Sequence, residues 1–430
     1  MFARTILAIS LGCAISSVVN AENTVSNQIE TIPANKSVPI ESYSLSQNKA
    51  EPATAVPAID HQAVIDESSD AEDNADESSV NEPSVNAATI DNTPPAPVTN
   101  TDRAVTTTSK NTPTKTTASL GTWTLDGINN SVWSTGMPID GRYPVFAKLQ
   151  VLLNDNHASP GPIDGAIGKA ENLKGGKNNT LKAISAYQTM NNLPVTGILD
   201  QATWDSLNSK SNGPAFVEYT ITEQDLKGPY AASIPSNYAE QAKMKSLYYT
   251  RVTEMLGEKF HMDEAFLKTL NPNASFKKAG EKIIVANVRN DLPQDIHLII
   301  AHKGAKQLYL FNSQNKMIAS FPATIGSTDT PSPEGTYTVK SIAPNPWYGY
   351  NPKNFVQGGN MKPLSLPPGP NNPVGNMWIG LSKPSFGIHG TPNPSTISKT
   401  ASHGCIRLTN WDANDLAKRV KPGITVKFLE

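Results

Sequence analysis

The residues of this sequence best suited to chemistry lie close together near its C-terminal end. A thiol (Cys405), two imidazoles (His389 and His403) and a guanidinium (Arg407) fall within residues 386–408. A thiol attacks well only as thiolate, and its usual pKa of about 8.5 leaves little thiolate at neutral pH. A neighbouring imidazole can take the proton, and a guanidinium offers a planar fork to a carboxylate. This set predicts nucleophilic cysteine chemistry on an anionic substrate.

The spacing of these residues limits how they can meet. His403 and Cys405 stand two apart, so an extended chain would point both the same way, whereas a tight turn through Gly404 need not. Gly404 permits a backbone conformation denied to other residues. Such a turn would aim the N–H groups of Gly404 and Cys405 at one point, as an oxyanion hole requires. His389 must be brought in by the fold.

Two other interpretations compete with catalysis. Cys405 could be an inert buried thiol, which is the commonest role of a lone cysteine. Alternatively, His389, His403 and Cys405 could bind zinc. The sequence has no Cys-x-x-Cys pair and no His-Glu-x-x-His motif to support a metal site. The recurrence of His-Gly beside Ser-His-Gly-Cys favours catalysis.

The stretch from 386 to 408, FGIHGTPNPSTISKTASHGCIRL, resembles the signature of the L,D-transpeptidase catalytic domain of the YkuD type. That family shows a histidine, a gap of variable length, and then Ser/Thr-His-Gly-Cys-x-Arg/Asn. The matching residues are His389, Ser402, His403, Gly404, Cys405 and Arg407. The resemblance covers residues 294–430 and includes Ile325-Gly326, Thr330-Pro331, Pro333-Glu334-Gly335 and Asn372-Pro373-Val374-Gly375.

The resemblance implies a role for each matching residue. Cys405 would be the nucleophile, His389 its base, and His403 and Gly404 would shape the loop and the oxyanion site. A second group is expected to bind or position substrate: Arg407, Ser402, Gly390, Trp347 and Tyr348. The Gly390 carbonyl would orient the His389 ring. The two aromatics fall in a Pro/Asn/Gly-rich loop at 343–375, either a lid over a donor peptide or a rigid loop with its aromatics in the core.

The implied reaction is acyl transfer on peptidoglycan, which crosslinks or tethers the cell wall. Cys405 would attack the carbonyl of the diamino-acid residue in a tetrapeptide stem, expel D-alanine, and pass the acyl group to an amine. No metal or organic cofactor is implied. Two alternatives keep the same fold: a cysteine carboxypeptidase or endopeptidase, in which water takes the acyl group, and a non-catalytic protein that anchors on peptidoglycan.

Length and composition predict a secreted chain of several modules. A chain of 430 residues exceeds one ordinary core, and a net charge of −2 argues against nucleic acid as partner. Residues 1–21 read as a signal peptide, with an apolar stretch too short to span a bilayer before Val-Asn-Ala. Cleavage there would remove Cys13, whose surroundings make a poor lipidation site. The mature chain is then expected in the periplasm or cell wall without a transmembrane segment.

The remaining segments predict a multidomain architecture. Residues 22–120 are expected to be a disordered spacer, because Tyr43 is the only aromatic up to Ser119. Residues 130–212 resemble a small three-helix peptidoglycan-binding domain, with Asp200 capping its third helix. Residues 217–288 resemble a LysM carbohydrate-binding module of order strand–helix–helix–strand, with an insertion at 228–245 and with His261 at a surface or boundary.

The C-terminal segment, residues 294–430, is expected to be mainly β and sandwich-like. The runs IHLIIAHK, KQLYLFN and KMIASFPATIG predict a meander with a hairpin turn at 312–315. One helix is predicted from Trp411 to about Arg419, capped by Asn410. The strands of this domain would deliver His389 and the Cys405 loop to one end.

Overall fold

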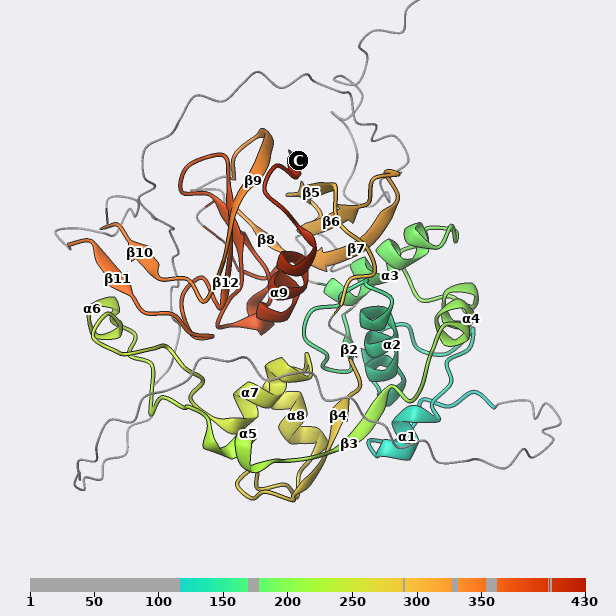
Figure 1. Ribbon diagram of the computed structural model, residues 1–430. Coiled ribbons are helices and arrows are strands. Elements are labelled where there is room, and N and C mark those ends of the chain that lie inside the picture. Colours follow the sequence, from blue (N-terminus) through green and yellow to red (C-terminus); the bar gives the residue numbers. More distant parts are fainter. Residues whose placement is uncertain are drawn as a thin grey trace, which may run out of the picture.

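The computed structural model describes residues 117–168, 178–288, 291–326, 332–352, 362–400, 402 and 404–430. The expected signal peptide, nearly all of the expected spacer and His403 lie outside these ranges. Within them, no helix combines the length and apolar character needed to cross a bilayer. Three modules follow one another along the chain and pack side by side, with the C-terminal module against both earlier ones (Figure 1).

The first module is helical. Its elements are α1 (Leu125–Asn129), α2 (Pro144–Asp155), α3 (Asn179–Met190), α4 (Gln201–Ser209) and the paired strands β1 (Gly141–Arg142) and β2 (Ala166–Ile167). Asp200 accepts a hydrogen bond from the Thr203 N–H and caps α4, which confirms that prediction. Ser119 pairs with Val132 by an isolated β-bridge, so the folded part begins slightly before the predicted end of the spacer.

The second module has the expected element order with additions. Strands β3 (Phe216–Thr220) and β4 (Lys282–Ala286) pair antiparallel and flank α7 (Val252–Lys259) and α8 (Glu264–Leu270). Two short helices, α5 (Glu223–Lys227) and α6 (Tyr238–Gln241), precede α7. The insertion that carries α6 reaches the third module, where its apolar side chains join a hydrophobic cluster.

The third module is built on a sheet that has nine strands in the described part of the chain, in the order β7-β6-β5-β15-β9-β12-β13-β14-β8. Its strands are β5 (Leu298–His302), β6 (Gln307–Phe311), β7 (Met317–Pro322), β8 (Thr324–Ile325), β9 (Gly335–Pro344), β12 (Met377–Leu381), β13 (Gly387–His389), β14 (Ile406–Arg407) and β15 (Thr425–Leu429). The meander of β5, β6 and β7 is confirmed.

This sheet curls strongly, because the short connection between its two edge strands draws the edges together. The edge strands β7 and β8 are separated in sequence by Ala323 alone, yet they stand at opposite ends of the strand order. The two edges must therefore approach each other around one enclosed core. That core holds residues from most strands together with α9 (Asn410–Arg419): Ile299, Leu308, Ile379, Ile388, Val426 and Leu416.

The loop at 343–375 is more ordered than a structureless lid. Strands β10 (Tyr348–Tyr350) and β11 (Leu364–Leu366) form an antiparallel pair within it. Alternation places Tyr348 and Tyr350 on one face, where the Tyr238 ring of α6 meets them edge-on at 6.0 and 5.2 Å between centroids. Residues 353–361 lie outside the described ranges. The insertion of the second module thus braces this hairpin.

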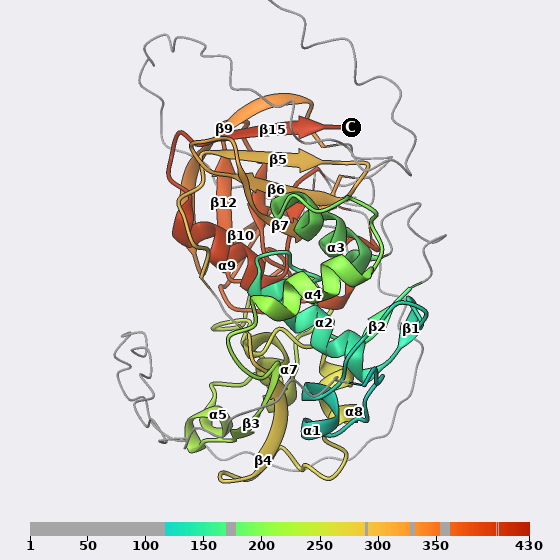
Figure 2. The ribbon, with the colours of Figure 1, turned by 90° about the vertical axis from the view of Figure 1, so that its right-hand side faces the viewer.

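The first module lies against the other two. Its segment at 157–163 runs between them: the Ser159 N–H donates to the Ser320 carbonyl in β7, and the Ile163 N–H donates to the His261 carbonyl. Helix α3 covers the outer face of the β5–β6–β7 edge (Figure 2). The first two modules also share one hydrophobic cluster: Ile128, Ala147, Val151, Ile163, Leu256 and Phe266. The three modules therefore pack as one body.

The start of α9 joins all three modules through consecutive residues. The Asn410 Nδ2 group donates to both carboxyl oxygens of Glu258 at 3.0 Å, and the Trp411 ring stacks on His261 at 5.1 Å. The Asp412 carboxyl accepts from the Ser159 hydroxyl at 3.0 Å.

Two predictions about this region were wrong. His261 is buried, 2% exposed, and lies within the contact between modules. Thr409 caps α9 by accepting from the Asp412 N–H, because the Asn410 carboxamide is engaged elsewhere.

We predict that Asp412→Asn weakens the loss of stability at alkaline pH. Burial raises the pKa of the Asp412 carboxyl from 3.8 to about 8, and the neighbouring Asp415 acts in the same direction. The folded protein keeps this proton up to about pH 8, whereas the unfolded chain releases it near pH 4. The stability of the wild type therefore falls as the pH rises across this window. A neutral amide removes the linkage and still accepts from Ser159.

Thermal unfolding between pH 5 and 9 measures this effect. The melting temperature of Asp412→Asn should fall less steeply than that of the wild type, whereas Asp205→Asn, at an exposed position on α4, should follow the wild type. Equal slopes for all three proteins would contradict the assignment.

Candidate active site

The parallel pairing of β13 with β14 forms the site. His389 stands opposite Arg407 and Ile388 opposite Ile406. Paired residues of neighbouring strands share a face, and side chains two apart on one strand also share it. The register therefore brings the imidazole of His389 and the guanidinium of Arg407 to one face of the sheet, and Cys405 lies in the turn that directly precedes β14. Neighbouring strands lie about 4.8 Å apart.

The His389 side chain is held as a neutral imidazole. It is 1% exposed, its ring stacks on Trp378 with centroids 5.7 Å apart, and Nδ1 lies 2.6 Å from the Gly390 carbonyl oxygen. A carbonyl only accepts, so Nδ1 carries the hydrogen and Nε2 the lone pair. Burial lowers the pKa of His389 from 6.5 to about 3; the Arg407 charge adds to this, and the Gly390 carbonyl opposes it. Nε2 has no partner among the described residues.

Two serine hydroxyls hold the Cys405 turn. Cys405 is 2% exposed, and its Sγ lies 3.7 Å from the Ser385 carbonyl oxygen. Ser332 Oγ donates to the Gly404 carbonyl at 2.9 Å, and Ser402 Oγ donates to the Cys405 carbonyl at 2.8 Å. Gly404 has φ +93°, the left-handed conformation that favours glycine. Because a peptide group is planar and trans, the Cys405 N–H points away from Ser332.

The remaining expected site residues fall into different settings. Arg407 is 2% exposed, and its Nη1 donates to Thr400 Oγ1 at 3.3 Å. Trp347 is 60% exposed, whereas Tyr348 is fully buried in the hairpin cluster. That cluster also contacts Trp378, the ring stacked on His389. The structure therefore groups Cys405, Gly404, Ser402, His389, Gly390 and Arg407 around β13 and β14, and the cluster that contains Tyr348 contacts Trp378, which stacks on His389.

Metal binding gains no support from the described part of the chain. No three His, Cys, Asp or Glu side chains gather there as ligands for an ion. His403, which a zinc site would need, lies outside the described ranges.

Comparison with known proteins places the chain in a family. Residues 296–427 match the L,D-transpeptidase catalytic domain, and residues 144–207 match a putative peptidoglycan-binding domain. The putative L,D-transpeptidase YkuD of Bacillus licheniformis is 30% identical over 177 residues, covering 41% of this chain and 92% of that protein. The chain belongs to the L,D-transpeptidase family.

Other relatives carry similar names. The putative L,D-transpeptidase YqjB of Bacillus subtilis is 32% identical over 142 residues, covering 32% of this chain and 73% of that protein. The crystal structure of L,D-transpeptidase 3 from Mycobacterium tuberculosis is 18% identical, with a TM-score of 0.26, and the match covers 31% of this chain and 60% of that one. At these values the structural likeness adds nothing to the family assignment.

Sequence reasoning missed one central residue of this L,D-transpeptidase family member. Asn410 Oδ1 accepts from the N–H groups of Thr391 at 3.1 Å and Asn376 at 3.3 Å. A Cβ atom at Gly390 or Gly375 would stand 2.1 Å from this oxygen, so both glycines make room for it. The sequence does contain a signal: Gly390 directly follows His389, and Asn410 follows the Cys405 motif. Only the fold shows that the two touch.

We predict that Gly390→Ala destabilises this L,D-transpeptidase family member by about 1–3 kcal/mol, as overpacking of a dense site does. The added methyl group would displace the Asn410 carboxamide and with it the peptide that orients His389. Gly304→Ala is the control, because its nearest non-bonded atom lies at an ordinary 3.5 Å. Urea unfolding monitored by circular dichroism compares the two variants. An unchanged midpoint for Gly390→Ala would refute the packing argument.

Proposed function

We propose that this chain is a peptidoglycan L,D-transpeptidase with Cys405 as nucleophile and His389 as base. The proposal is supported by the β13–β14 register, in which a neutral imidazole pairs with the strand that begins directly after Cys405. The lone pair of Nε2 is free of other partners in the described part of the chain, so it is available for a proton. The family assignment and the peptidoglycan-binding match at 144–207 support the substrate class.

In the first half-reaction the thiol proton passes from Cys405 Sγ to His389 Nε2. The thiolate bonds to the carbonyl carbon of the diamino-acid residue in a tetrapeptide stem. The N–H groups of the Gly404 turn then stabilise the oxyanion that forms. The C–N bond to the terminal D-alanine breaks, and the leaving amine takes the proton from His389. A thioester on Cys405 remains.

In the second half-reaction an acceptor amine attacks this thioester. Its nitrogen gives a proton to His389 Nε2, the C–S bond breaks, and the thiolate recovers the proton from the imidazole. One peptide bond is thus broken and one is formed, with no net change at the enzyme. The Arg407 charge beside His389 stabilises the anionic states and keeps the imidazole neutral between steps.

Substrate contacts are assigned from exposure. Trp347, 60% exposed beside the hairpin, presents its ring to the donor stem, whereas the buried Tyr348 supports the hairpin from within. Ser402 holds the Cys405 turn, and His403 completes the site by the family motif. No cofactor takes part in this scheme.

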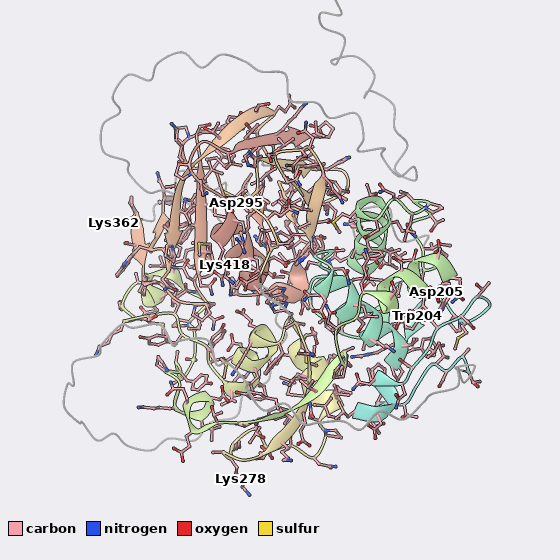
Figure 3. The ribbon with its side chains drawn as sticks, turned by 45° about the vertical axis from the view of Figure 1, so that its right-hand side comes forward. Trp204, Asp205, Lys278, Asp295, Lys362 and Lys418 are labelled. Atoms are coloured by element: carbon pink, nitrogen blue, oxygen red, sulfur yellow. The ribbon has the colours of Figure 1, made fainter. Side chains whose placement is uncertain are left out.

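The first two modules are proposed to hold the enzyme on its polymer outside the cytoplasm. The second module has the strand–helix–helix–strand order of a LysM-like carbohydrate binder. The exposed residues Asp205 of α4 and Lys278 near β4 lie on outer sides of the molecule, away from the catalytic sheet (Figure 3). Surfaces in these regions are open to a glycan strand, and binding there raises the local concentration of stem peptides without altering the chemistry.

Mass spectrometry of a disaccharide-tetrapeptide incubated with the protein tests this function. The wild type should yield crosslinked dimers with loss of D-alanine. Cys405→Ala should yield none, and His389→Gln should be slower by at least about 100-fold, the scale of a lost general base.

Other products would point elsewhere. A tripeptide without dimers would identify a cysteine carboxypeptidase. Unchanged substrate, with peptidoglycan retained on the protein, would identify a non-catalytic anchor. Circular dichroism on both variants ensures that lost activity does not reflect unfolding.

A further inference from the structure

A line of hydrogen bonds leads from His389 out of the catalytic module. Nδ1 of His389 donates to the Gly390 carbonyl at 2.6 Å. The same peptide group carries the Thr391 N–H, which donates to Asn410 Oδ1 at 3.1 Å. The other end of that carboxamide, Asn410 Nδ2, donates to both oxygens of the Glu258 carboxyl at 3.0 Å. Four groups are thus linked in sequence: an imidazole, a peptide, a carboxamide and a carboxyl.

The last member of this line belongs to another module. Glu258 lies in α7, and 152 residues separate it from Asn410 in the chain. Its carboxyl also accepts from the Tyr249 hydroxyl at 2.8 Å. Glu258, Tyr249 and Asn410 line a cavity of about 540 Å³ between α7 and α9. The carboxyl therefore sits at the boundary between the modules, held on two sides by donors.

The Asn410 carboxamide has little freedom of its own. Asn410 is 1% exposed, and its oxygen occupies the space over Gly375 and Gly390. A carboxamide rotated by half a turn would direct its NH₂ group at the Thr391 N–H and its oxygen at the Glu258 carboxyl. Two donors would then face each other at Thr391 and again at Asn376, and both Glu258 oxygens would lose the donor that they now share. The two N–H groups therefore select the orientation of the Asn410 carboxamide, and Glu258 holds its nitrogen end in place.

We propose that Asn410 and Glu258 are positioning residues of the acyl transfer, through which the second module orients the catalytic imidazole. Hydrogen bonds in a line polarise and stiffen one another. Here they fix the tautomer and the ring plane of His389, so that Nε2 faces the thiol. The second module is then a part of the active site as well as a module that holds polymer. This inference rests on the proposed function.

The kinetic test compares four variants with the donor and acceptor at saturation. Glu258→Ala should lower kcat about tenfold with KM within about twofold, the low end of what supporting residues contribute. Glu258→Gln keeps an acceptor for Asn410 and should restore kcat to within about threefold. Burial raises the pKa of Glu258 to about 8, so a neutral amide is a fair replacement near pH 7. Adding Glu258→Ala to Asn410→Ala should cause no further loss.

Glu254→Ala is the matched control. Glu254 lies one turn earlier on α7 and accepts from Asn371 at 2.8 Å across the same module boundary, but it is not a member of the line. Its kcat should stay within about twofold of the wild type. Equal losses at Glu254 and Glu258 would mean that docking alone matters, and a change confined to KM would mean substrate contact; either would overturn the proposal.

A substrate-free readout separates this inference from the proposed function. The Nδ1–H proton of His389 should give a strongly downfield NMR signal, which moves upfield in Glu258→Ala and stays in Glu258→Gln and Glu254→Ala. An unmoved signal in Glu258→Ala would overturn the positioning role. A wild type that makes no product would refute the function alone. Should Glu258→Ala not fold, Glu258→Met, of similar size and without an acceptor oxygen, replaces it.

Discussion

The hydrogen bonds of the Asn410 carboxamide hold two loops of the third module and join that module to the second. The carboxamide oxygen binds the N–H groups of two loops, at Thr391 after β13 and at Asn376 before β12. Its nitrogen binds Glu258 in the second module. A buried polar group is costly unless each donor and acceptor is satisfied, so the parts around Asn410 are held in one arrangement. Positions 375 and 390 require glycine in this arrangement, because any side chain there would collide with the carboxamide.

The three modules are joined by direct contacts, unlike independent domains on a string. Helix α9 begins three residues after Arg407 and contacts both upstream modules through Asn410, Trp411 and Asp412. The chain segment that carries the thiol is therefore continuous with the segment that joins the modules. The packing of the three modules and the position of the Cys405 turn then depend on the same end of one helix.

Several features followed directly from residue patterns. Short runs of β-branched and aromatic residues broken by turns predicted the β5–β6–β7 meander, and Asp200 marked the start of α4. The residues around His389 and Cys405 indicated their chemistry because a thiol needs a base, and a turn with φ of +93° needs a glycine such as Gly404. These inferences depend on residues that are close together in the chain, so they can be made from the sequence.

Other expectations failed where distant contacts overrode local preference. Asn410 suits a helix cap, but its carboxamide is taken by Thr391 and Glu258, and Thr409 caps α9 in its place. For the loop at 343–375 the sequence left a lid and a rigid loop with core aromatics both open, and the burial of Tyr348 and Tyr350 against the α6 insertion supports the second. His261 is polar, but it is buried because Trp411 stacks on it.

The sequence by itself determined the reactive groups, the family to which they belong and most of the helices and strands. The tertiary structure alone decided that β13 runs parallel to β14, that His389 is neutral with its hydrogen on Nδ1, and that Asn410 links Glu258 to the peptide beside His389. The physical reason is that these features depend on pairings between residues far apart in the chain, up to 152 positions. Burial and hydrogen bonding at such contacts are properties of the assembled fold, and no local pattern encodes them.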